Sequence, residues 1–93
     1  MFSENLKKTR QKIGLSQKDF AQKLEIQQSQ YSRYEIGTSP STDILNKLIQ
    51  VFNININYLL TGEGSMFITP ELKKDLLQFK IPKGSRVLLE IEN

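Results

Sequence analysis

The chain has 93 residues, enough for one small domain and an appended segment. It lacks cysteine and histidine, which excludes disulfides, thiolate or imidazole metal sites and histidine-based catalysis. Its net charge of +3 is carried entirely by the first 62 residues, a weak pointer to a nucleic-acid partner. No apolar stretch reaches 18 residues and no charged-then-apolar leader opens the chain, so we expect a cytoplasmic protein without membrane contact.

Two helices are predicted before residue 25. The first spans residues 3–13, with Ser3 as its N-cap and Gly14 as its stop. Its inward face consists of Leu6, Arg10 and Ile13. The second spans residues 16–24, with Ser16 as its N-cap. Its inward stripe consists of Phe20, Ala21 and Leu24.

A third and a fourth helix follow after short connectors. Residues 28–36 predict the third helix, in which Tyr31 and Tyr34 share a face that we assign to the core. The opposite face of this helix is polar. Residues 41–52 predict the fourth helix, because apolar side chains recur at the 3, 4, 7, 8 spacing of one helical face. These side chains are Ile44, Leu45, Leu48, Ile49 and Phe52.

The next segment predicts a fifth helix and a domain boundary. Residues 53–57 alternate like a strand, but we interpret them as a turn and a helix start capped by Asn55. The following side chains are predicted to be buried: Tyr58, Leu59 and Leu60. A glycine-rich turn then separates an N-terminal domain, residues 1–64, from a C-terminal extension, residues 65–93.

The extension differs in character from the domain. Thr69-Pro70-Glu71 is a good helix start, with proline at the first helical position. Residues 86–92 are β-prone and fit a short strand, which would need a partner such as its twin in a second subunit. With the fifth helix, we expect the extension to form a dimer contact through an apolar stripe of Met66, Phe67, Leu72, Leu76 and Phe79.

The most informative segment is residues 15–37, LSQKDFAQKLEIQQSQYSRYEIG, which places a polar, outward-facing helix after a short helix and a tight turn. Here the sequence resembles the lambda-repressor-like (Cro/repressor) helix-turn-helix family. The matching positions are Leu15, Ser16, Gln17, Ala21, Leu24, Ile26, Ser32, Arg33, Glu35, Gly37, Pro40 and Ser41. Residues 57–64, NYLLTGEG, also resemble the end of the family's domain. The resemblance covers residues 3–64 and implies an all-α, five-helix fold.

Two positions depart from the family's pattern. Glu25 stands where the family has glycine at the turn, and must take a helix-ending conformation that glycine adopts at lower cost. Gln27 replaces the Ser or Thr that caps the recognition helix. Both departures concern local stability. The resemblance further implies an ion pair between Arg10 and Glu35, which would tie the first helix to the end of the third.

The resemblance implies double-stranded DNA as the partner. A major groove admits one helix, and residues near its N-terminus meet base edges, which glutamine and arginine read through paired hydrogen bonds. The candidate contacts on the third helix are Gln27, Gln28, Ser29, Ser32 and Arg33. Gln17 is placed to meet a phosphate or a base. The loop residues Thr38, Ser39 and Thr42 are expected to touch the DNA backbone. Gln28 and Ser29 could instead be plain solvent-exposed residues, and Arg33 could pair with an acidic neighbour.

We expect a transcriptional regulator, most simply a repressor, that binds a pseudo-palindromic operator as a homodimer with half-sites roughly 34 Å apart. No catalytic residues, metal ligands or cofactor motif are found in the sequence, so an enzyme is not expected. One alternative is an antitoxin or adaptor module whose tail binds a protein partner. Another is the N-terminal part of a longer repressor.

Overall fold

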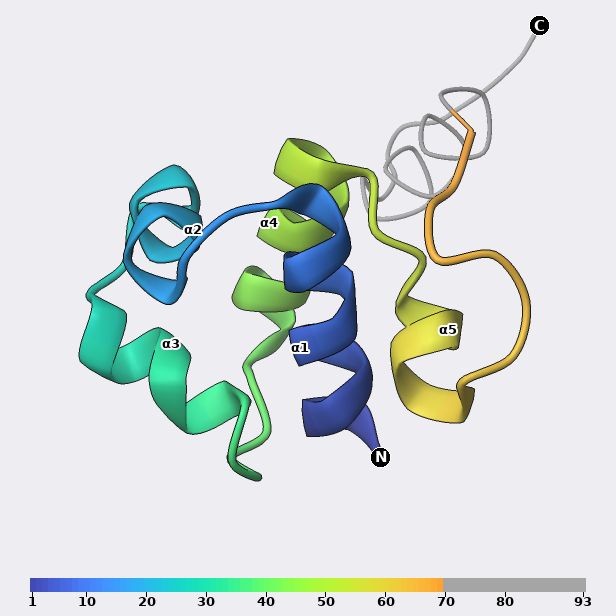
Figure 1. Ribbon diagram of the computed structural model, residues 1–93, viewed down its shortest axis with the longest axis horizontal. Coiled ribbons are helices and arrows are strands. Elements are labelled where there is room, and N and C mark those ends of the chain that lie inside the picture. The colour runs from blue at the N-terminus through green and yellow to red at the C-terminus, as the bar shows by residue number, and fades with distance from the viewer. Residues whose placement is uncertain (70–93) are drawn as a thin grey trace, which may run out of the picture.

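Five helices make up most of residues 1–69, the part of the chain that the computed structural model describes (Figure 1). They are α1 (Phe2–Ile13), α2 (Gln17–Leu24), α3 (Gln28–Tyr34), α4 (Thr42–Phe52) and α5 (Ile56–Thr61). Within residues 1–69 there is no sheet, only an isolated antiparallel bridge between Ile54 and Phe67. The all-α, five-helix prediction is confirmed, while the expected C-terminal helix and strand lie outside the described residues.

The helix ends follow the predicted caps, with one exception. The Ser16 hydroxyl accepts a hydrogen bond from the Asp19 N–H at 3.1 Å, and the Asn55 side chain accepts one from the Asn57 N–H at 3.1 Å. Ser3 is not the N-cap of α1, which begins one residue earlier than predicted, at Phe2, with Met1 as its N-cap. Phe2 packs against the core, and the Asn5 N–H bonds to the Met1 carbonyl at 3.0 Å, so burial of Phe2 extends the helix.

α3 ends at Tyr34, two residues before the predicted end. The N–H groups of Glu35 and Ile36 turn back to the carbonyls of Ser32 and Arg33, both at 3.1 Å, which tightens the last turn. Gly37 follows with φ at +126°, a conformation that favours glycine. Glu35 is the C-cap of α3 at this turn, and its side chain is buried.

The core is built from one face of each helix. Phe20 lies at its centre, stacked on Phe52 with ring centroids 4.2 Å apart and tilted against Tyr31 at 4.9 Å. Tyr31 and Tyr34 are buried as predicted. Leu59 is buried too, but Leu60 is 58% exposed, so its predicted burial is wrong. Adjacent positions on a helix are rotated by about 100°, and the short α5 points Leu59 into the core and Leu60 toward solvent.

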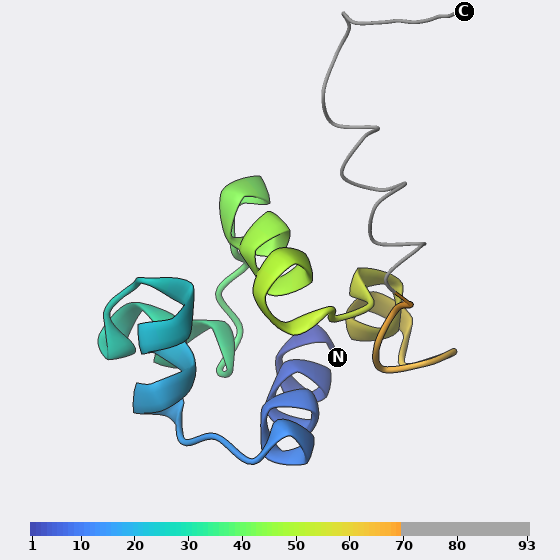
Figure 2. The ribbon, with the colours of Figure 1, turned by 90° about the horizontal axis from the view of Figure 1, so that it is seen from above.

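Two polar side chains, the buried Asn5 and the half-buried Lys47, join helices by capping the C-terminal ends of their neighbours. The Asn5 amide of α1 donates to the carbonyls of Tyr58 and Leu59 in α5, at 3.3 and 3.1 Å. The Lys47 ammonium of α4 donates to the Leu24 carbonyl at the end of α2, at 3.0 Å. These carbonyls lie in the last turns of their helices, where intrahelical donors run out; the Tyr58 carbonyl also accepts from the Gly62 N–H at 2.7 Å. The two Asn5 bonds hold α5 beside α1, as both views show (Figure 2).

The segment after α5 returns to the helical domain. The Asn55 N–H bonds to the Met66 carbonyl at 2.9 Å, and the Ile68 N–H bonds to the Asn53 carbonyl at 2.8 Å. Ile68 is buried, and Phe67, which we assigned to a dimer stripe, packs against the core of its own domain. The chain therefore keeps contact with the domain through Ile68, past the boundary expected at residue 64.

Candidate nucleic-acid interface

The turn between α2 and α3 is set by Glu25. This residue adopts the left-handed conformation, with φ 62° and ψ 40°. The Ile26 N–H then bonds to the Ala21 carbonyl at 3.0 Å, which closes the end of α2. Glu25 thus takes the helix-ending conformation expected where the family has glycine. Ala21, almost fully buried at the core side of α2, leaves room for the crossing of α3.

The outward face of α3 carries polar side chains. Gln27 occupies the N-cap position with an extended backbone and makes no side-chain cap bond, which agrees with its departure from Ser or Thr. Gln28, Ser29 and Arg33 are exposed, and Ser32 is half-buried on the same face. Tyr31 and Tyr34 anchor the opposite face in the core. The helix therefore presents its polar face as a protruding edge of the domain.

Beneath this edge lies a buried carboxylate with four side-chain donors. Glu35 accepts from Arg10 Nε at 2.7 Å and Nη2 at 3.3 Å, from Gln17 Nε2 at 2.9 Å, and from the Tyr31 hydroxyl. The Glu35 side chain is 2% exposed and that of Arg10 is 12% exposed. The ion pair implied by the family resemblance is confirmed. It ties α1 to the end of α3 with a two-pronged, charge-assisted contact.

The electrostatics of this cluster favour one protonation state. Burial alone would raise the pKa of Glu35, but hydrogen bonds from Arg10, Tyr31 and Gln17 outweigh it, and the pKa is lowered. The hydrogen bond to Glu35 raises the pKa of Arg10, while burial and then the bond to Glu35 raise the pKa of Tyr31. At neutral pH Glu35 is therefore a carboxylate that only accepts hydrogen bonds, and Tyr31 is a donor.

The cluster reaches the surface through Gln17 and Ser32. The Ser32 hydroxyl donates to Gln17 Oε1 at 2.9 Å, and the Gln17 amide nitrogen donates to Glu35. The sequence predicted both residues as separate DNA contacts and did not predict that they bond to each other. Gln17 begins α2 and Ser32 is in the last turn of α3, so only the crossing of the two helices brings them together. No local sequence signal would have found the contact.

Thr38, Ser39 and Thr42, the other predicted contacts, are exposed. Thr38 and Ser39 lie in the loop between α3 and α4, where the Thr38 N–H bonds to the Arg33 carbonyl at 2.9 Å. Ile36, 81% exposed at the start of this loop, was not among the predicted site residues. Thr42 starts α4, next to Ser41, whose hydroxyl accepts from the Ile44 N–H at 3.4 Å.

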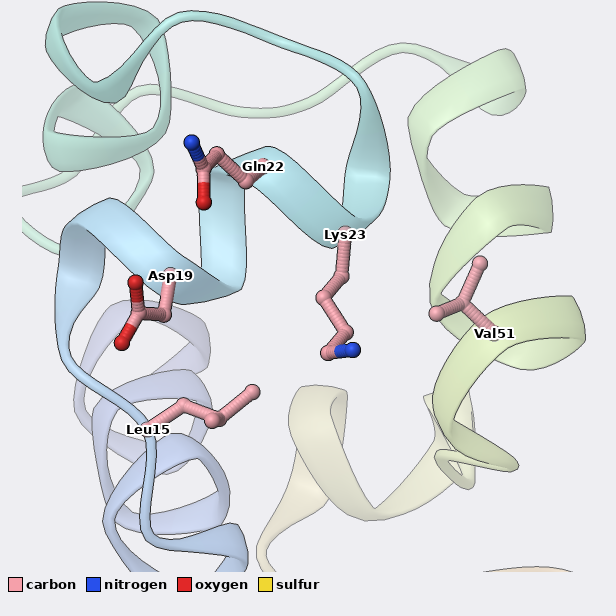
Figure 3. A pocket seen from close by; sticks show the side chains of 5 residues that line it. All are labelled: Leu15, Asp19, Gln22, Lys23 and Val51. Carbon is pink, nitrogen blue, oxygen red and sulfur yellow. The ribbon is translucent and has the colours of Figure 1, made fainter.

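A surface hollow lies between α2 and α4 (Figure 3). Its lining residues are Leu15, Asp19, Gln22, Lys23 and Val51. Asp19 and Lys23 are one helical turn apart, the ordinary spacing of surface charges on a helix, so the hollow supports no particular chemistry. Among residues 1–69, no group of three acidic side chains could hold a metal ion, and no helix is long and apolar enough to cross a membrane.

Comparisons with known proteins agree with this geometry. A helix-turn-helix family model matches residues 6–59. The Bacillus subtilis uncharacterized HTH-type transcriptional regulator YqaE is 36% identical over 78 residues, which cover 83% of this chain and 67% of that protein. The B. subtilis HTH-type transcriptional regulator ImmR is 39% identical over 86 residues, covering 91% and 65%. Antitoxin PezA of Streptococcus pneumoniae is 34% identical over 85 residues, covering 89% and 52%.

No solved structure is significantly similar to the chain. The chain spans about two thirds of YqaE and of ImmR and about half of PezA. The family match runs from the first half of α1 into α5 and contains the whole α2–turn–α3 unit. The chain therefore belongs to the lambda-repressor-like helix-turn-helix family.

Proposed function

We propose that this protein is a sequence-specific DNA-binding transcriptional regulator and not an enzyme. The observation that carries the proposal is the polar face of α3, which protrudes from the domain while two tyrosines fix its other face in the core. A helix presented in this way fits the major groove. The names of YqaE and ImmR, HTH-type transcriptional regulators, support the same role.

In the proposed complex the first turn of α3 reads bases and its surroundings hold the DNA backbone. Gln28 and Ser29, both exposed, meet base edges, and Arg33 meets a base or a phosphate. Gln27 lies at the helix entrance, where the backbone N–H groups face outward. Ser32 is a further base contact on α3, and Gln17, Thr38 and Ser39 contact the DNA backbone. Only the base contacts discriminate between sequences, while the others set the position of the domain.

The experiment that tests this role is selection of preferred sites from random duplex DNA, followed by binding measurements at several salt concentrations. The protein should enrich a defined sequence, and its affinity should fall steeply with salt because phosphate contacts release counterions. Replacing Gln28 and Ser29 by alanine should weaken discrimination between the selected site and random DNA while leaving the melting temperature unchanged. Replacing the exposed Gln11 and Gln22 is the matched control, with no expected effect.

The regulator acts, in this proposal, as a cytoplasmic homodimeric repressor on a pseudo-palindromic operator, with half-sites roughly 34 Å apart. The exposed Leu60 on α5 supports a dimer contact there, continued by the extension of residues 65–93. Leu60→Asp should convert the dimer to a monomer in light scattering. Val51→Asp, at another exposed apolar residue, should not. A wild-type protein that stays monomeric at high micromolar concentration contradicts this part of the proposal.

A second candidate role rests on the similarity to antitoxin PezA. In this alternative the extension binds a protein partner and the helical domain either still reads DNA or only supports the extension. Salt dependence tests the second form of this alternative, since an adaptor without DNA binding has no affinity for duplex at low salt.

A further inference from the structure

The chain of hydrogen bonds from Glu35 to the surface has a fixed direction. Glu35 is a carboxylate and can only accept, so the group of Gln17 that faces it must be the amide nitrogen. The Gln17 oxygen then points the other way and accepts from the Ser32 hydroxyl. A flipped amide would set its oxygen against the carboxylate and its nitrogen against the hydroxyl. Each link thus determines the next.

The direction of this chain decides what Ser32 can offer to a ligand. A serine hydroxyl has one hydrogen to donate and two lone pairs to accept with. Its hydrogen is used in the bond to Gln17, at 2.9 Å, so only lone pairs remain for a partner outside the protein. Ser32 lies one turn after Gln28 on the polar face of α3 and is half-buried. An isolated serine on a helix surface would be free to use its hydroxyl either way.

We propose that Glu35 is a positioning residue for DNA recognition: through Gln17 it fixes the Ser32 hydroxyl as a hydrogen-bond acceptor, so that Ser32 reads an exocyclic amino group in the major groove. Each base pair there presents one amino group, N6 of adenine or N4 of cytosine, and one carbonyl, O4 of thymine or O6 of guanine. A free hydroxyl meets either group. An acceptor-only hydroxyl pairs with the amino group and is repelled by the carbonyl.

Gln17 is oriented by the same chain. One hydrogen of its amide nitrogen bonds to Glu35, and the second is left for a ligand. A phosphate oxygen is an acceptor and needs such a donor. The network therefore presents the Gln17 amide of α2 as a donor to the DNA backbone and the Ser32 hydroxyl of α3 as an acceptor to a base edge. This inference rests on the proposed function, DNA binding through α3.

The test uses the full chain and base analogues. Site selection with the wild-type protein and with Ser32→Ala first identifies the base pair whose preference depends on Ser32. At that pair, one duplex lacks the amino group (purine for adenine, or 2-pyrimidinone for cytosine). The other lacks the carbonyl (5-methyl-2-pyrimidinone for thymine, or 2-aminopurine for guanine). Wild-type affinity should fall about tenfold without the amino group and less than about twofold without the carbonyl.

Variants then separate positioning from general stability. In Glu35→Gln and in Gln17→Met, the loss of affinity without the amino group should become about equal to the loss without the carbonyl, so that the ratio of the two losses is close to one. The Ser32 hydroxyl is then free to turn and can donate or accept. Asn5→Ala is the structural control, since it removes two hydrogen bonds between α1 and α5 and does not touch the network. It should lower the melting temperature and keep the wild-type ratio.

The outcomes are distinguishable. A protein that enriches no sequence and binds no duplex at low salt refutes the proposed function itself. A protein that binds its site, but shows no position dependent on Ser32 or loses more affinity without the carbonyl, refutes the inference alone. The inference is also refuted if Glu35→Gln keeps the wild-type ratio, or if Asn5→Ala abolishes it as completely as Glu35→Gln does.

Discussion

Replacing Arg10 by methionine tests how the buried carboxylate is stabilised. The change keeps most of the side-chain volume but removes both nitrogens that contact Glu35 and the Nη1 donor to the Leu15 carbonyl at 2.8 Å. The Glu35 side chain is only 2% exposed, so water cannot replace the lost donors. Removing one partner of a buried ion pair costs about 3–5 kcal/mol. At about 4–8 °C per kcal/mol for a domain of this size, the melting temperature should fall by more than about 12 °C.

The double variant Arg10→Met and Glu35→Met isolates the charge. With both ions gone, the unpaired carboxylate no longer destabilises the fold, and the variant should unfold above the Arg10→Met melting temperature. The double variant should remain less stable than the wild type, because Tyr31 and Gln17 still lack their acceptor. Urea denaturation followed by circular dichroism gives the free energies. A single variant within about 1 kcal/mol of wild type, or a double variant no more stable than the single one, refutes the reasoning.

The pH dependence of the same variant gives an independent check. In the wild type, hydrogen bonds led by that of Arg10 lower the pKa of Glu35 against the opposing effect of burial. Without Arg10, burial dominates and the pKa of Glu35 should rise above its ordinary value. The carboxyl can then become neutral at mildly acidic pH, which relieves the unpaired charge. The stability gap between wild type and Arg10→Met should therefore narrow as the pH falls from 7 to about 5.

Three further predictions concern the wild-type pH dependence, the turn after α2 and the core. Because the folded-state pKa of Glu35 is lowered, its contribution to wild-type stability is present above about pH 4.5 and is lost as the pH falls through the folded pKa. Urea denaturation at a series of pH values should show this loss of stability. The Glu35→Gln variant should not show the part of the pH dependence that comes from Glu35. Glu25→Gly should stabilise by about 1 kcal/mol by relieving the positive φ, whereas Glu25→Ala should not, as thermal melts will show. Phe20→Ala should destabilise by about 3–5 kcal/mol, and Phe20→Leu by clearly less, since Phe20 is fully buried against Phe52 and Tyr31.

The sequence predicted the helical domain because its signals are local. Apolar spacing located α4, and short polar side chains located the N-caps of α2 and α5. Even the unusual backbone of Glu25 followed from its place in the family's pattern. The start of α1 was misplaced because the attraction of Phe2 to the core is a tertiary effect that outweighs a suitable cap at Ser3.

The candidate site was predicted as a set of residues but not as a network. Gln17 and Ser32 were chosen from their places in two helices, and the sequence holds no sign that their side chains meet. The Arg10–Glu35 pair could be anticipated only through the family resemblance, since 25 residues separate its members. Leu60 was assigned to the core because three apolar residues in a row do not show which one faces inward.

The side chain of Asn55, at the start of α5, makes two structural contacts at once. Asn55 Oδ1 accepts from the Asn57 N–H at 3.1 Å and so caps the start of the helix. Its Nδ2 donates to the Ser65 carbonyl at 2.8 Å and holds the segment that follows α5. A displacement of the segment at Ser65 would therefore move the Asn55 side chain that caps α5. One side chain therefore joins Ser65 to the first turn of α5, and Asn5 joins α5 to α1. A change in the position of Ser65 would thus alter the cap of α5 directly, because the same asparagine makes both contacts.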